Sequence, residues 1–291
     1  MKKIIFFLCL IVVLYSCFQN KTENTGIIYS DFNTSTLYQG TDILFSTKDK
    51  QTLQKSGYSM AVNYLYDSYN DELWISSEGK SNTIILFQCG EKEFIQESIH
   101  IAFNDRPFIC GIYNNTLLNC IDSSNAQYEL ISIDEQSRRL IEIRCEEILL
   151  LPIGFSGDKI YFNDGYFDLN EHIFHTYAIE LRYKRIVGED ICIGLNNLNE
   201  IVLYHIDSKQ ITNTGIHRNL DSYARYSPDN LYFFKDNILY YSEDFLILPI
   251  IRRLFPIWYT RTTWKTKNLT TGEISQIQKI HKQCRIIGIS K

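Results

Sequence analysis

Two histidines, His172 and His175, stand three residues apart and could bind a metal ion together. Residues three apart in a strand point to opposite sides of a sheet, so joint ligation by two imidazoles needs a turn or a helix. The aspartates nearby lack the alternating spacing of a calcium-binding loop; they are Asp158, Asp164 and Asp168. No phosphate-binding loop, dinucleotide fingerprint or H-E-x-x-H pattern is found. The sequence therefore predicts no metal, no cofactor and no locally encoded catalytic residue.

Cysteine is the other reactive residue type, and the chain has eight of them. Cys9 and Cys17 lie near the N-terminus, and six lie in the body of the chain: Cys89, Cys110, Cys120, Cys145, Cys192 and Cys284. None of the six forms a C-x-x-C or zinc-like spacing, and most stand in apolar runs. We interpret them mainly as small buried side chains. Disulfide bonds among them are the alternative, since an exported chain allows them.

The expected strand register predicts how Cys110 and Cys120 lie relative to each other. Residues 108–122 have the pattern of a hairpin whose two-residue turn is Asn-Asn, because asparagine tolerates positive φ. A regular hairpin pairs Cys110 with Asn119 and Cys120 with Ile109. The two cysteines then point to opposite faces of the sheet, which predicts no disulfide between them.

A segment near the C-terminus, residues 245–264, is apolar, aromatic and basic, and two prolines in it exclude a regular long helix. Aromatic residues and arginine are enriched where proteins bind partners. The residues suited to partner contact are Arg252, Arg253, Trp258 and Tyr259. A buried strand followed by a packed loop has the same composition and is the interpretation we favour, with a partner-binding lip as the alternative.

The N-terminus has the features of an export signal. Two lysines precede an apolar run, residues 4–14, which is too short to span a bilayer and is typical of a signal peptide. Leu14-Tyr15-Ser16-Cys17 then resembles the lipobox of bacterial lipoproteins in its looser, Bacteroides-type form, with Tyr15 in place of the usual small residue. The resemblance implies removal of residues 1–16 and a membrane anchor of acyl chains, such as palmitate, on Cys17. An ordinary signal peptide is the alternative.

Residues 17–26 are polar and unpatterned, and we expect a lipidated tether there, with residues 27–291 as the exported domain. Without Lys2 and Lys3 the chain keeps 27 of its 29 Lys+Arg against 34 Asp+Glu, a formal charge of −7. This charge gives no electrostatic reason for nucleic-acid binding. The acidic run that can follow the cysteine in surface-exported lipoproteins of such bacteria is missing, which favours the periplasmic side of the cell envelope over the cell surface.

Composition and spacing predict the elements that position these residues. The chain has 42 Ile but only 5 Ala, which fits half-buried strands and disfavours helices. Apolar segments recur in pairs around charged turns, which are centred near residues 49, 91, 136, 182, 208 and 271. A period of roughly 45 residues is typical of propeller blades with four strands each. Six blades fit the length; five or seven blades, or a β-sandwich, are the alternatives, and the uneven later spacing indicates an irregular blade or one mis-phased hairpin.

Short turns before some of the strands support the propeller. Residues 155–159, 226–230 and 68–71 resemble the F-S-P-D-G-K turn of WD40-like repeats, as in Tol-type periplasmic propellers. The resemblance implies a β-propeller and no particular activity. Residues 284–290 predict a last strand that pairs into the first blade and closes the ring. We therefore expect a non-enzymatic module that binds an envelope protein or a small ligand; a carbohydrate-active enzyme, a glycoside hydrolase or lyase with two or three carboxylates in the central channel, is the alternative.

Overall fold

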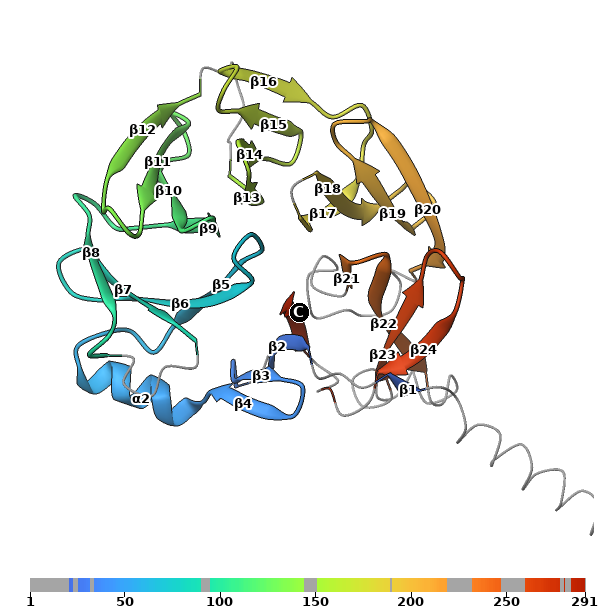
Figure 1. The fold of residues 1–291 in the computed structure, drawn as a ribbon, viewed down its shortest axis with the longest axis horizontal. Helices are drawn as coiled ribbons and strands as arrows, with labels where there is room; N and C mark the ends of the chain where they lie inside the picture. Colours follow the sequence, from blue (N-terminus) through green and yellow to red (C-terminus); the bar gives the residue numbers. More distant parts are fainter. Residues whose placement is uncertain are drawn as a thin grey trace, which may run out of the picture.

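The strands of the computed structural model form six sheets that stand around a common centre like the blades of a propeller (Figure 1). The structure describes residues 21–22, 26–31, 34–89, 95–143, 151–188, 190–218, 232–246, 260–277, 280 and 284–290. Five sheets have four strands, and one has a fifth strand at its edge. The all-β propeller with six four-stranded blades, predicted from the sequence, is confirmed.

Each blade extends from an innermost strand at the centre to an outer strand at the rim (Figure 1). The first blade contains β25 (Cys284–Ile289), β2 (Ile27–Asp31), β3 (Leu37–Gln39) and β4 (Asp42–Phe45). The second contains β5 (Val62–Asp67), β6 (Glu72–Glu78), β7 (Thr83–Gln88) and β8 (Ile99–Ala102). The third contains β9 (Ile109–Tyr113), β10 (Thr116–Asp122), β11 (Gln127–Ser132) and β12 (Arg138–Glu142).

The remaining three blades continue in chain order. The fourth contains β13 (Gly154–Ser156), β14 (Lys159–Tyr161), β15 (Gly165–Asp168) and β16 (Ile173–Thr176). The fifth contains β17 (Arg182–Ile186), β18 (Ile191–Leu195), β19 (Glu200–His205) and β20 (Gln210–His217). The sixth contains β21 (Tyr232–Lys235), β22 (Ile238–Leu246), β23 (Thr260–Asn268) and β24 (Ile274–Ile277).

The first blade combines the two ends of the chain. Its innermost strand, β25, pairs antiparallel with β2, so that Ile27 lies opposite Ile289 and Asp31 lies opposite Cys284. This pairing removes a free strand edge from the centre of the ring. The prediction that residues 284–290 close the propeller is confirmed.

A two-residue strand, β1 (Lys21–Thr22), pairs in parallel with β24 at the outer edge of the sixth blade. These two residues belong to the segment 17–26, which the sequence predicts to be an unpatterned tether, so part of that segment lies against the propeller. Cys17 and the apolar run before it lie outside the described residues. In the part of the chain that the structure describes, no helix has the length and apolar character needed to cross a membrane.

The apolar core lies in layers between neighbouring blades. In β7, Ile84 and Leu86 pack toward the third blade, whereas Ile85 and Phe87 pack toward the first. All four side chains are at most 2% exposed. Strand alternation therefore buries both faces of the blade, which explains why the chain uses many isoleucines and few alanines.

One expected turn, residues 48–50, is instead the start of a helix. It is α2 (Thr47–Lys55), and no other helix occurs in the described ranges. The Asp49 carboxylate accepts a hydrogen bond from the Ser46 backbone N–H at 2.7 Å, which satisfies a donor at the helix start. Lys50, whose side chain is buried, donates from Nζ to the backbone oxygens of Thr34 (2.9 Å) and Ser35 (2.8 Å) and joins the helix to the first blade.

A second expected turn, the one centred near residue 182, lies inside β17. The register shifts between Arg182 and Arg185, and Tyr183 has a φ of 53°, which together mark a β-bulge. The outer turn of the fourth blade is found at residues 169–172, between β15 and β16. The fourth hairpin was therefore mis-phased, because the positive-φ bulge has the same composition as a turn.

The predicted hairpin of residues 108–122 is confirmed as β9 and β10, with Asn114 (φ 46°) and Asn115 (φ 53°) at the turn. The expected register is wrong beyond Leu118, where a β-bulge at Cys110 shifts the pairing. The predicted turns at residues 68–71 and 155–159 join β5 to β6 and β13 to β14. The turn expected at residues 226–230 lies outside the described residues.

Candidate functional site

A cavity of ≈ 400 Å³ lies at the centre of the ring. Each blade contributes its innermost strand to the wall, and these strands are β5, β9, β13, β17, β21 and β25. Sites for small ligands are concave and mostly apolar, with a few polar groups in fixed places. Polar and apolar surface contribute about equally to this wall, and it has four charged residues, which are Arg185, Lys235, Asp236 and Arg285.

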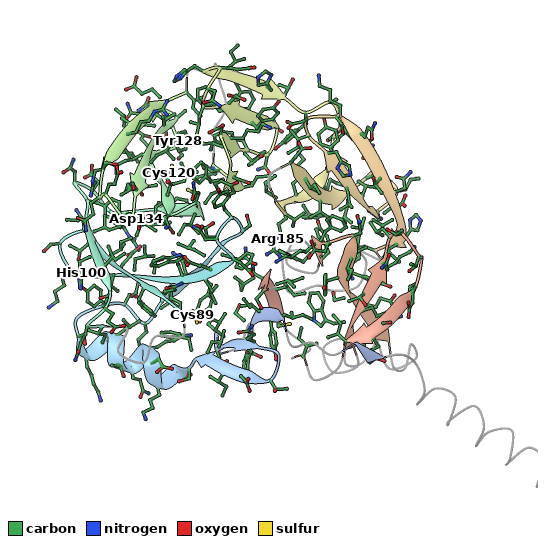
Figure 2. The ribbon with its side chains drawn as sticks, in the orientation of Figure 1. Cys89, His100, Cys120, Tyr128, Asp134 and Arg185 are labelled. Carbon is green, nitrogen blue, oxygen red and sulfur yellow. The ribbon has the colours of Figure 1, made fainter. Side chains whose placement is uncertain are left out.

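Arg185 projects from β17 toward the centre of the ring (Figure 2). Its guanidinium donates hydrogen bonds to the backbone oxygens of Ile286, at 2.7 Å, and of Tyr232, at 3.4 Å. It also lies 4.7 Å from the centre of the Phe233 ring, which favours a cation over its face. Arg185 therefore joins the fifth blade to the innermost strands of the sixth and the first.

Lys235, on β21, makes a second connection of this kind. Its Nζ lies 3.2 Å from the Tyr66 hydroxyl and 3.6 Å from the Asp71 carboxylate, and it donates to the backbone oxygen of Ile289. The Tyr66 hydroxyl lies 2.8 Å from the Ile289 oxygen and also contacts Asp71. Burial and the hydrogen bond to Asp71 raise the pKa of Tyr66, so its hydroxyl keeps its proton at neutral pH. These contacts join the sixth, first and second blades.

The cavity wall is cationic although the chain is acidic. Three of its four charged residues are cations, whereas the whole chain has a formal charge of −5. The backbone oxygens that bind Arg185 carry no net charge. Arg285 is an exposed side chain of β25. Low-dielectric walls focus the field of such charges, and the cavity therefore favours an anionic group.

One polar atom of the wall is buried without a hydrogen-bond partner. Ser156 is 3% exposed, and its Oγ has no hydrogen-bond partner among the residues that the structure describes. A buried hydroxyl in this state costs about 1–3 kcal/mol, which a polar group of a bound molecule can offset. Phe155 and Phe233 add aromatic surface to the wall. The wall thus combines cations, a buried hydroxyl and apolar surface.

A buried carboxylate, Asp67, connects the second and third blades beside the cavity. It is 0% exposed and accepts a hydrogen bond from the backbone N–H of Tyr69, at 3.0 Å, in its own turn. It also accepts from the backbone N–H groups of Asn114 (3.0 Å) and Asn115 (2.9 Å) in the next blade. Hydrogen bonds to an ionised acceptor are stronger than neutral ones, so Asp67 fixes two of the inner turns relative to each other.

The residues that the sequence predicts to bind a lipid or a partner lie outside the described residues. They are Cys17, Arg252, Arg253, Trp258 and Tyr259.

The two histidines that could have shared a metal lie in the hairpin of β15 and β16, at the rim. His172 has a φ of 58° at the turn, and His175 stacks on Tyr166 with ring centres 4.9 Å apart. The Nε2 atom of His175 lies 3.0 Å from the Glu171 carboxylate. Among the described residues, no group of three or more His, Cys, Asp or Glu side chains is placed to hold a metal ion.

Sequence reasoning missed the cavity residues Arg185, Lys235 and Tyr66. They stand on three strands of three blades, so no local spacing relates them. The available signal was a charged residue at the end of an apolar segment that leads into a turn, as in Tyr232-Phe233-Phe234-Lys235. Such a residue on an innermost strand faces the channel, but the innermost strand must first be known.

The alternative function, carbohydrate cleavage, needs a pair of carboxylates that flank the substrate. Asp236 is the one carboxylate that the described residues contribute to the cavity wall. A second carboxylate, that of Asp71, lies beside Tyr66. The Asp71 carboxylate is bound by Lys235 and by the Tyr66 hydroxyl.

No family model matches the sequence, and no curated protein matches it either. Solved structures with a similar fold include the computationally designed Ika8 protein, with a TM-score of 0.42, 10% identity, and coverage of 77% of this chain and 63% of that chain. The N-terminal domain of Nup159 has a TM-score of 0.41, 9% identity, and coverage of 90% and 69%. The tricorn protease has a TM-score of 0.38, 11% identity, and coverage of 70% and 20%.

This chain spans less than two thirds of the Ika8 chain and a fifth of the tricorn chain. At these identities the likeness concerns the fold alone. The propeller assignment rests on the strand order of this chain and not on these similarities.

Proposed function

We propose that this protein is an exported, lipid-anchored β-propeller that binds a small organic anion in its central cavity and catalyses no reaction. The observation that carries the proposal is the composition of the cavity wall. Cations outnumber carboxylates there, and the buried Ser156 hydroxyl has no partner.

The size and lining of the cavity define the class of ligand. A volume of ≈ 400 Å³ lies at the lower end of the range of small-molecule sites, which is roughly 300–1,000 Å³. The anionic group would bind near the exposed Arg285, a polar group would bond to Ser156, and an aromatic or aliphatic body would pack on Phe155 and Phe233. An aromatic or medium-length carboxylate that also carries a hydroxyl group has all three parts.

Binding of 8-anilinonaphthalene-1-sulfonate, an aromatic anion that fluoresces in apolar sites, tests the proposal. We expect saturable binding at one site, and we expect Arg285→Gln and Ser156→Ala each to raise its Kd about three- to tenfold, which corresponds to the loss of one hydrogen bond. Benzoate should compete with the probe. Arg106→Gln is the matched control, because Arg106 is exposed and paired with Glu78 in the second blade, away from the cavity wall.

Unsaturable fluorescence, or equal affinity in the wild type, Arg285→Gln and Ser156→Ala, would contradict binding in the cavity. A circular dichroism melt of each variant confirms that the propeller is intact.

The membrane anchor is a separate part of the proposal and rests on the resemblance of residues 14–17 to a lipobox. β1 begins four residues after Cys17, and four residues span at most about 14 Å. An acylated Cys17 would therefore hold the rim of the sixth blade close to the membrane. Labelling of cells with palmitate should mark the protein, and Cys17→Ser should abolish the label; a label that persists in this variant would contradict the anchor.

The same proposal assigns contact with an envelope protein to the segment between β22 and β23. Its residues Arg252, Arg253, Trp258 and Tyr259 combine aromatic rings with cations. Cross-linking in intact cells should capture one partner with the wild type and lose it in Arg252→Ala/Trp258→Ala. Equal capture by both proteins would contradict this role.

A further inference from the structure

The innermost strands define two ends of the ring, because each is the first strand of a blade repeated around the centre and all six run in the same direction. They begin at the first end, where the Tyr232 hydroxyl at the start of β21 donates to the backbone oxygen of Tyr183, near the start of β17. They finish at the second end, where Lys235 of β21 contacts Tyr66 of β5 and Ile289 of β25. The cavity wall contains residues from both ends, so a ligand has two directions of approach.

The second end carries negative charge beside the cavity. Asp236 follows β21 and belongs to the cavity wall, and Asp71 lies in the turn after β5. Asp158 and Asp190 lie in the corresponding turns of the fourth and fifth blades, after β13 and β17. Lys235 also lies at this end, where its Nζ is 3.6 Å from the Asp71 carboxylate. An anion that approaches the second end therefore meets carboxylates.

The first end carries positive charge, most of it on β17. Three of the five residues of this strand are cations, namely Arg182, Lys184 and Arg185, and Glu180 is a carboxylate two residues before the strand. Arg285, the second residue of β25, lies at the same end. Arg185 and Arg285 line the cavity, whereas Arg182 and Lys184 are not part of its wall. The positive charge therefore continues from the wall along β17 toward the first end.

The contacts of Arg182 and Lys184 are with uncharged groups. Arg182 donates to two oxygens of the turn 196–199, at 3.0 and 2.5 Å. Lys184 donates to the backbone oxygen of Asn163 and lies 5.5 Å from the centre of the Tyr177 ring. Within the described ranges neither side chain forms an ion pair with a carboxylate. Both are therefore placed to attract an anion from solution.

We propose that anionic ligands enter the cavity from the first end, where Arg182 and Lys184 attract them before they reach Arg285. This inference rests on the proposed function, since it concerns the same anion and the same cavity. Charges outside a binding site change mainly the rate of encounter and its salt dependence. Arg182 stands three residues before the wall residue Arg185, which is at most about 10 Å along a strand. The Debye length is about 10 Å at 0.1 M salt and about 30 Å at 0.01 M, so these charges act over the required distance.

The association rate constant of 8-anilinonaphthalene-1-sulfonate, measured by stopped-flow fluorescence on the full chain, tests this route. At about 0.01 M salt we expect Arg182→Gln and Lys184→Gln each to lower this rate constant about twofold, and the double variant to lower it about three- to fourfold. The dissociation rate constant should not rise, because both side chains lie outside the cavity wall. At about 1 M salt, where the Debye length is about 3 Å, the variants and the wild type should agree.

Two variants at the second end serve as controls. Lys209→Gln removes an exposed cation of the same blade, in the turn between β19 and β20, and should leave the association rate constant unchanged. Asp158→Asn removes a carboxylate beside the cavity at that end and should also leave it unchanged, because the ligand does not pass there.

An unchanged association rate constant in Arg182→Gln/Lys184→Gln at low salt would overturn the proposed route, as would an equal decrease in Lys209→Gln or an increase in Asp158→Asn. Each of these results leaves the cavity as the binding site, whereas unsaturable binding to the wild type would contradict the proposed function and this inference with it. Circular dichroism melts show whether each variant is folded; if Arg182→Gln is not, Lys184→Gln decides alone.

Discussion

Two junctions beside the cavity hold neighbouring blades together in different ways. Between the second and third blades the chain is continuous, and one carboxylate, Asp67, bonds to backbone amides of the next blade. The first blade instead takes β25 from the far end of the chain. Arg185 and Lys235 reach it from the fifth and sixth blades, and Tyr66 reaches it from the second.

The difference shows what closing a ring requires. β2 and β25 lie more than 250 residues apart in sequence, so their pairing carries a larger loop-closure entropy than pairing within one blade. Side-chain donors from three blades, of which Arg185 and Lys235 are charged, offset that cost by bonding to the backbone of β25. Arg185 and Lys235 therefore have a structural role besides their place in the cavity wall.

The largest effect should follow from removal of residues 284–291, which contain β25. Four of its side chains are at most 8% exposed, namely Cys284, Ile286, Ile287 and Ile289. Their burial contributes about 5–10 kcal/mol, which is comparable with the whole free energy of unfolding of a domain. We expect no cooperative melt by circular dichroism. Removal of residues 18–22, which takes away the edge strand β1, should leave the melt within a few degrees; equal melts for the two truncations would contradict the role of β25.

Arg185→Met should cause the next largest loss of stability, because it removes the guanidinium that donates hydrogen bonds to the backbone oxygens of Ile286 and Tyr232. Hydrogen bonds of charged donors contribute about 1.5–3 kcal/mol each and are not additive, so we expect a loss of about 3 kcal/mol in urea unfolding. Arg182→Met is the control on the same strand, since Arg182 is exposed and bonds within its own blade, to Asn196 at 3.0 Å. Similar losses for both arginines would contradict a clamp at Arg185.

The sequence alone predicted the propeller because its signals are local and repeated. Alternating apolar residues, as in Ile84 to Phe87, and a closing strand at residues 284–290 need no knowledge of distant contacts. The β-bulges at Tyr183 and Cys110 could not be predicted, because a bulge depends on the packing of the next blade. Gly111, for example, would place a Cβ 3.3 Å from the Cβ of Phe155 in the fourth blade.

The candidate site was beyond sequence reasoning for a related reason. Arg185 bonds to Ile286, which lies 101 residues away, and Tyr66 bonds to Ile289, which lies 223 residues away. No spacing rule relates such residues. The residues that line the cavity could be identified only from the three-dimensional arrangement of the blades.

Asp67→Ala tests the other side of the comparison. It leaves the amides of Tyr69, Asn114 and Asn115 without their acceptor, and we expect a loss of about 2 kcal/mol in urea unfolding, because these donors are partly buried. Asp122→Ala is the matched control: Asp122 accepts from Ser124 and Asn125 in its own exposed turn and joins no other blade. A change at Asp122 as large as at Asp67 would show that the turn, and not the junction, is what Asp67 stabilises.

Tyr66→Phe should have the smallest effect on stability, about 1 kcal/mol at pH 7, because one hydroxyl is lost and Lys235 still bonds to Ile289.

The pH dependence of this stability difference gives a second test of the Tyr66 hydroxyl. The pKa of Tyr66 is raised in the folded protein by burial and by Asp71, so above pH about 10 the unfolded chain releases this proton first and the wild type loses stability. Phenylalanine has no such proton, and the deficit of the variant should shrink between pH 9 and about 11 in urea unfolding. Tyr69→Phe, at an exposed residue of the same blade, is the control. If the stability deficit of Tyr66→Phe stays constant from pH 9 to about 11, the folded protein does not hold the proton of the Tyr66 hydroxyl more tightly than the unfolded chain does.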